Sequence, residues 1–226
     1  TRNLVTWNTM ISGYGSHGEF PKAINFFNEM RTSGISPDGV TFLSLISSCN
    51  HSGLVNEGLK LYELMREYRV EPGMEHYINM VDLLGRAGFL DDAYGFINNM
   101  HIEADESVWL CLLSACQVHR KIELGELAAQ SLFKMDPTNG SYYIPLLNLY
   151  VDAGLQDKAA NLRSSMRQRG LKKTPGCSWI EVKNQVDVFF SGDSSSRKTI
   201  QIYEALQSLR SNMKRTEDSL EVEDAV

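Results

Sequence analysis

Residues 4–38 read LVTWNTMISGYGSHGEFPKAINFFNEMRTSGISPD, and this stretch decides the fold. Its apolar residues recur at helical spacing in two runs, which predicts one helix near Trp7–His17 and a second over about Pro21–Thr32. Gly18 is placed to end the first helix, and a proline suits the first turn of the second. Residues 33–38 contain glycine and proline, which turn the chain into the next unit. The stretch therefore predicts a helical hairpin.

The same pattern recurs along the chain with a period close to 35 residues. Methionines close successive amphipathic stretches at spacings of 35, 35, 35 and 31 residues: Met30, Met65, Met100, Met135 and Met166. A period in the thirties indicates stacked helical hairpins, each of which is too small to bury its apolar face alone. We therefore predict an all-α fold, an α-solenoid of helix-turn-helix repeats.

The repeat rhythm ends after residue 173. The segment TPGCSWIEVKNQVDVFFSGD has alternating apolar residues on both sides of Lys183–Gln185, which predicts a small β-hairpin with a turn at those three residues. A helix is predicted near Lys198–Lys214, with Ile202, Leu206 and Leu209 on one face. Residues 216–226 are acidic and lack a core pattern, so we predict that they are disordered.

Charge is distributed unevenly in a chain whose formal net charge is -6. Residues 1–105 hold 7 basic and 13 acidic side chains, whereas residues 140–215 hold 12 basic and 6 acidic ones. The negative net charge of the chain argues against a general binder of polyanions, which would carry a basic stripe. The second half of the chain is nevertheless expected to have a positive face.

The cysteines and the chain start bear on where the protein works. Four cysteines in 226 residues do not form a disulfide framework, so we expect a reducing compartment. There is no run of about eighteen apolar residues, and we therefore expect no membrane span. The chain starts at Thr1 within a motif, which is typical of a C-terminal fragment that carries no targeting segment.

Residues 5–38, VTWNTMISGYGSHGEFPKAINFFNEMRTSGISPD, strongly resemble a pentatricopeptide repeat (PPR). The next segments, GVTFLSLISSCNHSGLVNEGLKLYELM and MEHYINMVDLLGRAGFLDDAYGFINNM, resemble the long and short motifs of the plant PLS-class proteins. The later segments resemble their E motifs and their PG-box and E+ region. The resemblance implies a right-handed α-solenoid with a C-terminal hairpin and helix extension.

The resemblance also divides the chain. It implies the end of a preceding repeat at 1–3, a P-type PPR at 4–38, a long PPR at 39–73, a short PPR at 74–105, a first E motif at 106–139, a second E motif at 140–173, the E+ and PG-box region at 174–215 and an acidic tail at 216–226.

Proteins that this chain resembles select particular cytidines of chloroplast or mitochondrial transcripts for conversion to uridine. The resemblance implies an adaptor that binds single-stranded RNA and recruits a DYW-type cytidine deaminase in trans, with multiple organellar RNA editing factor proteins as further partners. Two alternatives stay open. One is a protein-binding helical scaffold without RNA specificity, and the other is the non-catalytic part of a longer DYW deaminase.

In the first repeat, the resemblance places the base-reading positions at Val5, Asn8 and Asp38. The Asn8 amide can donate and accept at the Watson–Crick edge of a pyrimidine, and Asp38 can orient this amide directly or through water. Val5 can sandwich the base. The family's code implies uracil first and cytosine second. The alternative is that Asn8 and Asp38 are ordinary solvated residues.

Weaker candidates for RNA contact lie further along the chain. The matching positions of the next two repeats are Val40, Leu43, Gly73, Glu75, Ile78 and Asp105. Leucine and isoleucine cannot read a base edge, so packing or solvation is the alternative for this set. A basic cluster, Arg163, Arg167, Arg169, Lys172 and Lys173, could contact RNA phosphates, with a solvated helix face as its alternative.

The second half of the chain suits protein contact better than base reading. We predict a docking surface for the deaminase-bearing partner in the E motifs, the hairpin and the box Pro175, Gly176, Cys177, Ser178 and Trp179. An unpaired strand edge is a template for strand addition. Trp179 could anchor the partner, although packing of the hairpin onto the last repeat is the favoured alternative.

A deaminase within the chain is the strongest competing hypothesis. His101-Ile102-Glu103 matches the H-x-E element of zinc deaminases, but no P-C-x-x-C follows it. Cys111 and Cys116 have C-x4-C spacing and are predicted to be buried small hydrophobic residues. We therefore predict no enzymatic activity, no metal site and no cofactor in this chain.

Overall fold

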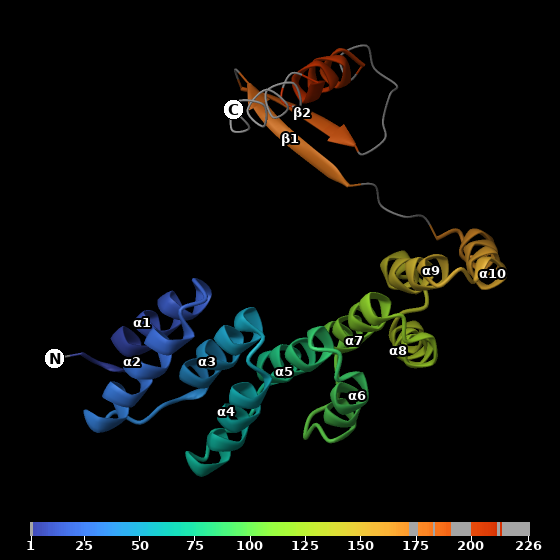
Figure 1. Ribbon diagram of the computed structural model, residues 1–226. Coiled ribbons are helices and arrows are strands. Elements are labelled where there is room, and N and C mark those ends of the chain that lie inside the picture. Colours follow the sequence, from blue (N-terminus) through green and yellow to red (C-terminus); the bar gives the residue numbers. More distant parts are fainter. Residues whose placement is uncertain (1, 172–175, 183, 191–199, 212, 214–226) are drawn as a thin grey trace, which may run out of the picture. The chain divides into compact units, whose positions relative to one another are not determined.

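The computed structural model describes residues 2–171, 176–182, 184–190, 200–211 and 213. The chain forms two compact units, residues 1–173 and 174–226. In the first unit the helices follow one another as antiparallel pairs (Figure 1). Their bounds are α1 Leu4–Ser16, α2 Phe20–Thr32, α3 Gly39–Ser52, α4 Val55–Glu67, α5 Met74–Arg86, α6 Leu90–Asn98, α7 Glu106–His119, α8 Ile122–Met135, α9 Tyr143–Asp152 and α10 Gln156–Gln168, with a 3-10 turn at Gly140–Tyr142 before α9.

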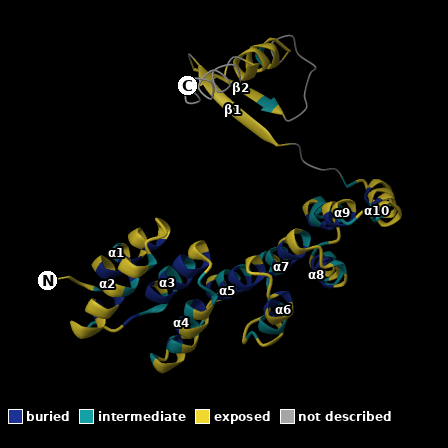
Figure 2. Ribbon diagram, viewed as in Figure 1, coloured by how far each residue is buried: buried dark blue, intermediate teal, exposed yellow. Residues whose placement is uncertain are grey.

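The helix pairs stack through their first helices, because α1 packs on α3, α3 on α5, α5 on α7 and α7 on α9. The second helices α2, α4, α6 and α8 each pack on the first helix of their own pair and on that of the next pair, and α10 packs on α9. Buried residues lie where neighbouring helices face each other (Figure 2). The predicted α-solenoid is therefore confirmed.

The core consists of two hydrophobic clusters that meet near the middle of the first unit, where Val55 and Phe96 pack against both. Of the methionines that revealed the repeat, Met30 and Met65 are fully buried. Met135 is 44% exposed, although it also ends a helix. Met166 is buried as well, so the methionine spacing marks the repeat, although not every one of these methionines belongs to the core.

The helix boundaries follow from capping. Side chains of Asn3, Asp38 and Asp105 accept hydrogen bonds from the third backbone N–H of the helix that follows each of them. The first helix therefore begins at Leu4, and the predicted start near Trp7 was wrong because the Asn3 cap extends the helix toward the N-terminus. The first turn of each pair has a left-handed residue, Gly18 in the first pair and Arg120 where the glycine is replaced.

The second unit contains the predicted hairpin. β1 Cys177–Val182 pairs antiparallel with β2 Gln185–Phe190. Gln185 pairs with Val182, so the predicted three-residue turn was wrong and Asn184, with φ of 60°, lies in a shorter one. Two-residue loops with positive φ match the twist of paired strands. Residues 200–211 are helical as predicted, whereas Lys198, Lys214 and the tail at 216–226 lie outside the described residues.

The contact between α5 and α7 gives a stability prediction. A Cβ added at Gly85 would lie 2.7 Å from the Cβ of Ala115. Overpacking costs about 1–3 kcal/mol, and the better helix propensity of alanine returns only about 1 kcal/mol. We expect Gly85→Ala to lower the free energy of unfolding by about 1 kcal/mol in urea titrations followed by circular dichroism.

Two further variants control this prediction. Gly95→Ala in α6 has no atom within 4 Å of the added Cβ and should leave the protein equally or more stable. Ala115→Gly should cost less in the Gly85→Ala background than alone, because it removes the clashing atom. Equal stability of Gly85→Ala and Gly95→Ala would contradict the close approach of the two helices.

Candidate nucleic-acid interface

Asn8 in α1 and Asp38 at the start of α3 are in direct contact. The Asn8 Nδ2 donates to the Asp38 Oδ1 at 3.0 Å. Asn8 is only 8% exposed, and Asp38 is half-buried. Asn8 is therefore enclosed by the packing of α3 on α1, whereas Asp38 stays partly exposed to solvent.

Thr41, which sequence reasoning missed, completes this contact. Its Oγ1 donates to the Asn8 Oδ1 at 2.6 Å and lies 2.9 Å from the Asp38 Oδ1. The backbone N–H of Thr41 donates to the same Asp38 oxygen at 2.9 Å, and the Asp38 N–H donates to the Thr41 Oγ1 at 3.1 Å. The spacing Asp38-Gly-Val-Thr41 is a capping-box pattern, and this signal could have revealed Thr41.

The charge of Asp38 determines which end of the Asn8 amide lies against it. Burial by itself raises the pKa of the Asp38 carboxyl, but hydrogen bonds from the Thr41 N–H and from the Asn8 and Thr41 side chains hold this pKa below its usual value. Asp38 is therefore ionised at neutral pH and can only accept hydrogen bonds. Consequently the NH₂ end of the Asn8 amide, rather than its oxygen, faces Asp38.

A groove of about 600 Å³ runs between α1 and α3 beside this network. Asn8, Asp38 and one exposed valine from each helix line it: Val5 is 70% exposed and Val40 is 55% exposed. The sequence assigned Val40 to the next repeat, but the structure places it in the groove of the first. The groove thus combines exposed apolar side chains with an amide whose NH₂ end lies against Asp38.

The next interface, between α3 and α5, has a different construction. Leu43 in α3 and Ile78 in α5 occupy the places in their own repeats that correspond to Asn8 in the first repeat. Both are half-buried apolar residues. At the place of Thr41 stands His76, whose Nδ1 accepts from the Gly73 N–H at 3.1 Å and whose Nε2 lies 2.9 Å from the Gly39 carbonyl. His76 therefore joins two backbone segments. The amide-carboxylate pair of this interface, Asn50 Nδ2 to Asp82 Oδ2 at 2.8 Å, is formed by other residues than those at the places of Asn8 and Asp38.

The remaining weak candidates of these two repeats are Glu75, which is exposed, and Asp105, which caps α7 through the Val108 N–H at 3.1 Å. Asp105 thus repeats the capping role of Asp38. Ile78 stands at the place that corresponds to Asn8, so the Asp105 carboxylate has no side-chain amide to orient. The capping pattern is shared between the two repeats, whereas the hydrogen bond from a side-chain amide to the capping carboxylate is found at Asp38.

The basic cluster is partly described. Arg163 and Arg167 are exposed on α10 at a spacing of four residues, which places them on the same helix face. Arg169 is also exposed, and its Nη1 donates to the Tyr143 hydroxyl at 3.0 Å. Lys172 and Lys173 lie outside the described residues. Phosphate contact by this cluster stays a prediction.

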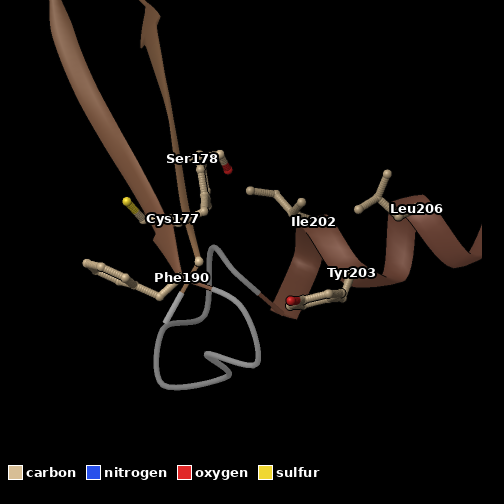
Figure 3. A pocket seen from close by; sticks show the side chains of 8 residues that line it. Cys177, Ser178, Phe190, Ile202, Tyr203 and Leu206 are labelled. Atoms are coloured by element: carbon tan, nitrogen blue, oxygen red, sulfur yellow. The ribbon is translucent and has the colours of Figure 1, made fainter. Parts of the chain in front are cut away.

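The predicted docking box belongs to the second unit, and its Pro175 lies outside the described residues. Gly176, Cys177 and Ser178 line an apolar pocket of about 440 Å³. Its other lining residues are Phe189, Phe190, Ile202, Tyr203 and Leu206 (Figure 3). Trp179 is 71% exposed and pairs with Val188. Because adjacent strand residues alternate between faces, Trp179 and Ser178 belong to opposite faces of the hairpin.

The H-x-E match lies on the surface. His101 and Glu103 are exposed in the segment after α6, and the His101 N–H donates to the Tyr77 hydroxyl at 3.3 Å. Burial raises the pKa of the Cys116 thiol to about 12 and that of the Cys111 thiol to about 11. In the part of the chain that the structure describes, no three His, Cys, Asp or Glu side chains gather to hold a metal ion. Nor does any described helix have the length and apolar character to cross a membrane.

Family models match three parts of the chain. The PPR repeat family matches residues 2–51, the PPR repeat matches residues 40–70 and 75–103, and the E motif matches residues 119–181.

Curated relatives come from Arabidopsis thaliana. One pentatricopeptide repeat-containing protein is 57% identical over 213 residues, which is 94% of this chain and 25% of the relative. The chloroplastic relative DOT4 is 44% identical over 94% of this chain and 25% of its own length, and a mitochondrial relative is 43% identical over 96% and 24%. The chain thus spans about a quarter of the length of these relatives.

Solved structures share the fold of the helical unit. The maize pentatricopeptide repeat protein PPR10 matches with a TM-score of 0.63 and 23% identity over 77% of this chain and 26% of its own. The PPR domain of Arabidopsis protein-only RNase P 1, solved in complex with tRNA, matches with a TM-score of 0.58 and 12% identity over 76% of this chain and 92% of its own. At such identities the likeness concerns the fold alone.

Proposed function

Because the chain belongs to the pentatricopeptide repeat family, we propose that it binds single-stranded RNA and reads one pyrimidine with Asn8. Proteins of this family read one base per repeat with two or three side chains. The observation that carries the proposal is the network of Asn8, Asp38 and Thr41 beside a groove with exposed valines. An amide held in one orientation next to apolar side chains suits the edge and the faces of a base.

The hydrogen-bonding capacity of Asn8 supports this reading. A side-chain amide has two N–H donors and two acceptor positions. Asp38 takes one donor and Thr41 takes one acceptor position, so one N–H and one acceptor position are left for a ligand. A pyrimidine offers a neighbouring donor and acceptor on its Watson–Crick edge. We propose uracil as the preferred base and cytosine as the second.

For the whole protein we propose a specificity adaptor for cytidine-to-uridine editing of organellar transcripts. The match to the E motif and the relatives with chloroplastic and mitochondrial names support it. We propose that a DYW-type deaminase docks on the E motifs and the hairpin, where Trp179 is exposed, and that the chain itself is not an enzyme. Multiple organellar RNA editing factor proteins are proposed as further partners, and Arg163 and Arg167 as contacts to phosphate.

The second candidate is a helical scaffold that binds only proteins. The net charge of -6 and the apolar residues Leu43 and Ile78 at reading positions favour it. A scaffold would use its grooves for protein segments and would show no preference among bases. The two candidates therefore differ in a property that RNA binding measures directly.

The test is fluorescence anisotropy with labelled single-stranded RNA probes that differ only in one nucleotide. We expect the uridine probe to bind best, the cytidine probe next, and the purine probes about tenfold weaker, since one or two hydrogen bonds of about 1 kcal/mol each are lost. Affinity should fall as salt concentration rises. Equal affinity for the four probes would favour the scaffold. In a plant that lacks the gene, editing should be lost at one or a few cytidines, and unchanged editing would contradict the adaptor.

A further inference from the structure

We propose that Thr41 is a positioning residue that determines which pyrimidine the Asn8 site prefers. The proposal rests on the proposed function, because it assigns a role at the same site. Thr41 belongs to α3, in the repeat after the one that contains Asn8, and it is fully buried. Its hydroxyl does not reach solvent, so its effect on a base has to pass through Asn8.

Three hydrogen bonds join the residues in a closed ring. Asn8 Nδ2 donates to Asp38 Oδ1 at 3.0 Å, Thr41 Oγ1 donates to Asn8 Oδ1 at 2.6 Å, and the Asp38 N–H donates to Thr41 Oγ1 at 3.1 Å. Within the ring each residue gives one hydrogen bond and receives one, and the Thr41 N–H adds a second bond to the Asp38 Oδ1. Consecutive hydrogen bonds that share a polar group, here the Thr41 hydroxyl and the Asn8 amide, polarise one another and become stronger together. The ring therefore holds both ends of the Asn8 amide.

Both ends have to be held for a pyrimidine to be chosen. Uracil has an acceptor at its O4 next to the N3–H donor, whereas cytosine has a donor at its N4 next to the N3 acceptor. An amide in one fixed orientation presents its N–H and its oxygen in one order and so fits one of these patterns. An amide that turns over presents the other order. Asp38 holds the NH₂ end and Thr41 holds the oxygen, so together they prevent this exchange.

Removal of the Thr41 hydroxyl would leave the buried Asn8 oxygen without its partner. A buried acceptor without a hydrogen bond is costly, so the amide would rotate toward other donors, including the N4 amino group of cytosine. Asp38 alone would then hold the amide by one contact. We therefore expect a loss of discrimination between the pyrimidines rather than a loss of RNA binding.

The test compares three variants of the chain with anisotropy on the uridine and cytidine probes. Thr41→Val keeps the shape of the side chain and removes the hydroxyl, and it should lower the ratio of uridine to cytidine affinity about threefold or more. Thr41→Ser restores the hydroxyl and should restore the ratio. Thr6→Val is the control for helix capping, because Thr6 holds the same third position of its helix and its hydroxyl donates to the capping residue Asn3 without a bond to Asn8. It should leave the ratio unchanged.

The outcomes separate the two proposals. Suppose that the wild-type chain prefers uridine, and that Thr41→Val either lowers the affinities for the uridine and cytidine probes by the same factor or leaves both unchanged. Thr41 then only supports the fold, and this inference is wrong. If Thr6→Val lowers the ratio as much as Thr41→Val, the effect comes from helix capping and the inference is also wrong. If the wild-type chain shows no preference among the four probes, the proposed function itself fails.

Discussion

Replacing Asn8 with leucine is expected to abolish the preference for uridine and to lower affinity for the uridine probe about tenfold, which corresponds to one or two hydrogen bonds of about 1 kcal/mol each. Leucine has the same branched arrangement of non-hydrogen atoms as asparagine but neither donates nor accepts hydrogen bonds. The chain contains its own precedent, because Leu43 occupies the corresponding place in α3 and is half-buried there. Anisotropy with the four probes measures both effects.

A matched control separates base reading from a general effect of the substitution. Asn28 lies exposed on α2, a second helix, and does not line the groove between α1 and α3. Asn28→Leu should therefore leave affinity and base preference unchanged. Persistence of the uridine preference in Asn8→Leu would show that another side chain reads the base. Circular dichroism should give the same helix content for both variants.

The arrangement of helices could be predicted from the sequence because the residues that become buried recur at regular intervals. Apolar residues return with each helical turn and with each repeat, so the two helices over Leu4–Ser16 and Phe20–Thr32 were recognisable before any contact was known. The start of the first helix was predicted three residues too late. The cap at Asn3 is a hydrogen bond of a single polar side chain, and hydrophobic periodicity does not report it.

The candidate site could be predicted only in part, because it is shared by two repeats. The resemblance identified Asn8 and Asp38, and their contact is present. Thr41 and the position of Val40 in the groove were missed because both residues belong to the next repeat. A sequence period shows which residues are equivalent in successive repeats, but it does not show which residues of different repeats are in contact. In the same way, alternation predicted a hairpin but not that Trp179 lies opposite Val188. Register is a property of the paired strands together.

Replacing Phe42 with alanine is expected to lower the free energy of unfolding by about 3–5 kcal/mol, more than any other substitution proposed for this protein. Removal of a buried phenylalanine ring leaves a cavity that the neighbouring side chains fill only in part. Phe42 in α3 is fully buried. Its ring lies 5.9 Å from the ring of Phe27 in α2 and 5.8 Å from that of Tyr68 after α4, measured between centroids. Arg31 lies over both of these rings. One side chain thus joins the first helix pair to the second.

In a solenoid each repeat contacts only its neighbours, so this loss should be local. Hydrogen exchange should accelerate in α1 and α2 while α7 to α9 keep their protection, and the uridine preference should disappear because Asn8 and Thr41 belong to the two pairs that separate. Phe89→Ala is the control, since Phe89 is 50% exposed and its removal should cost about 1 kcal/mol or less. A uniform rise in exchange along the chain would contradict local uncoupling and would mean that the helix pairs unfold as one cooperative unit.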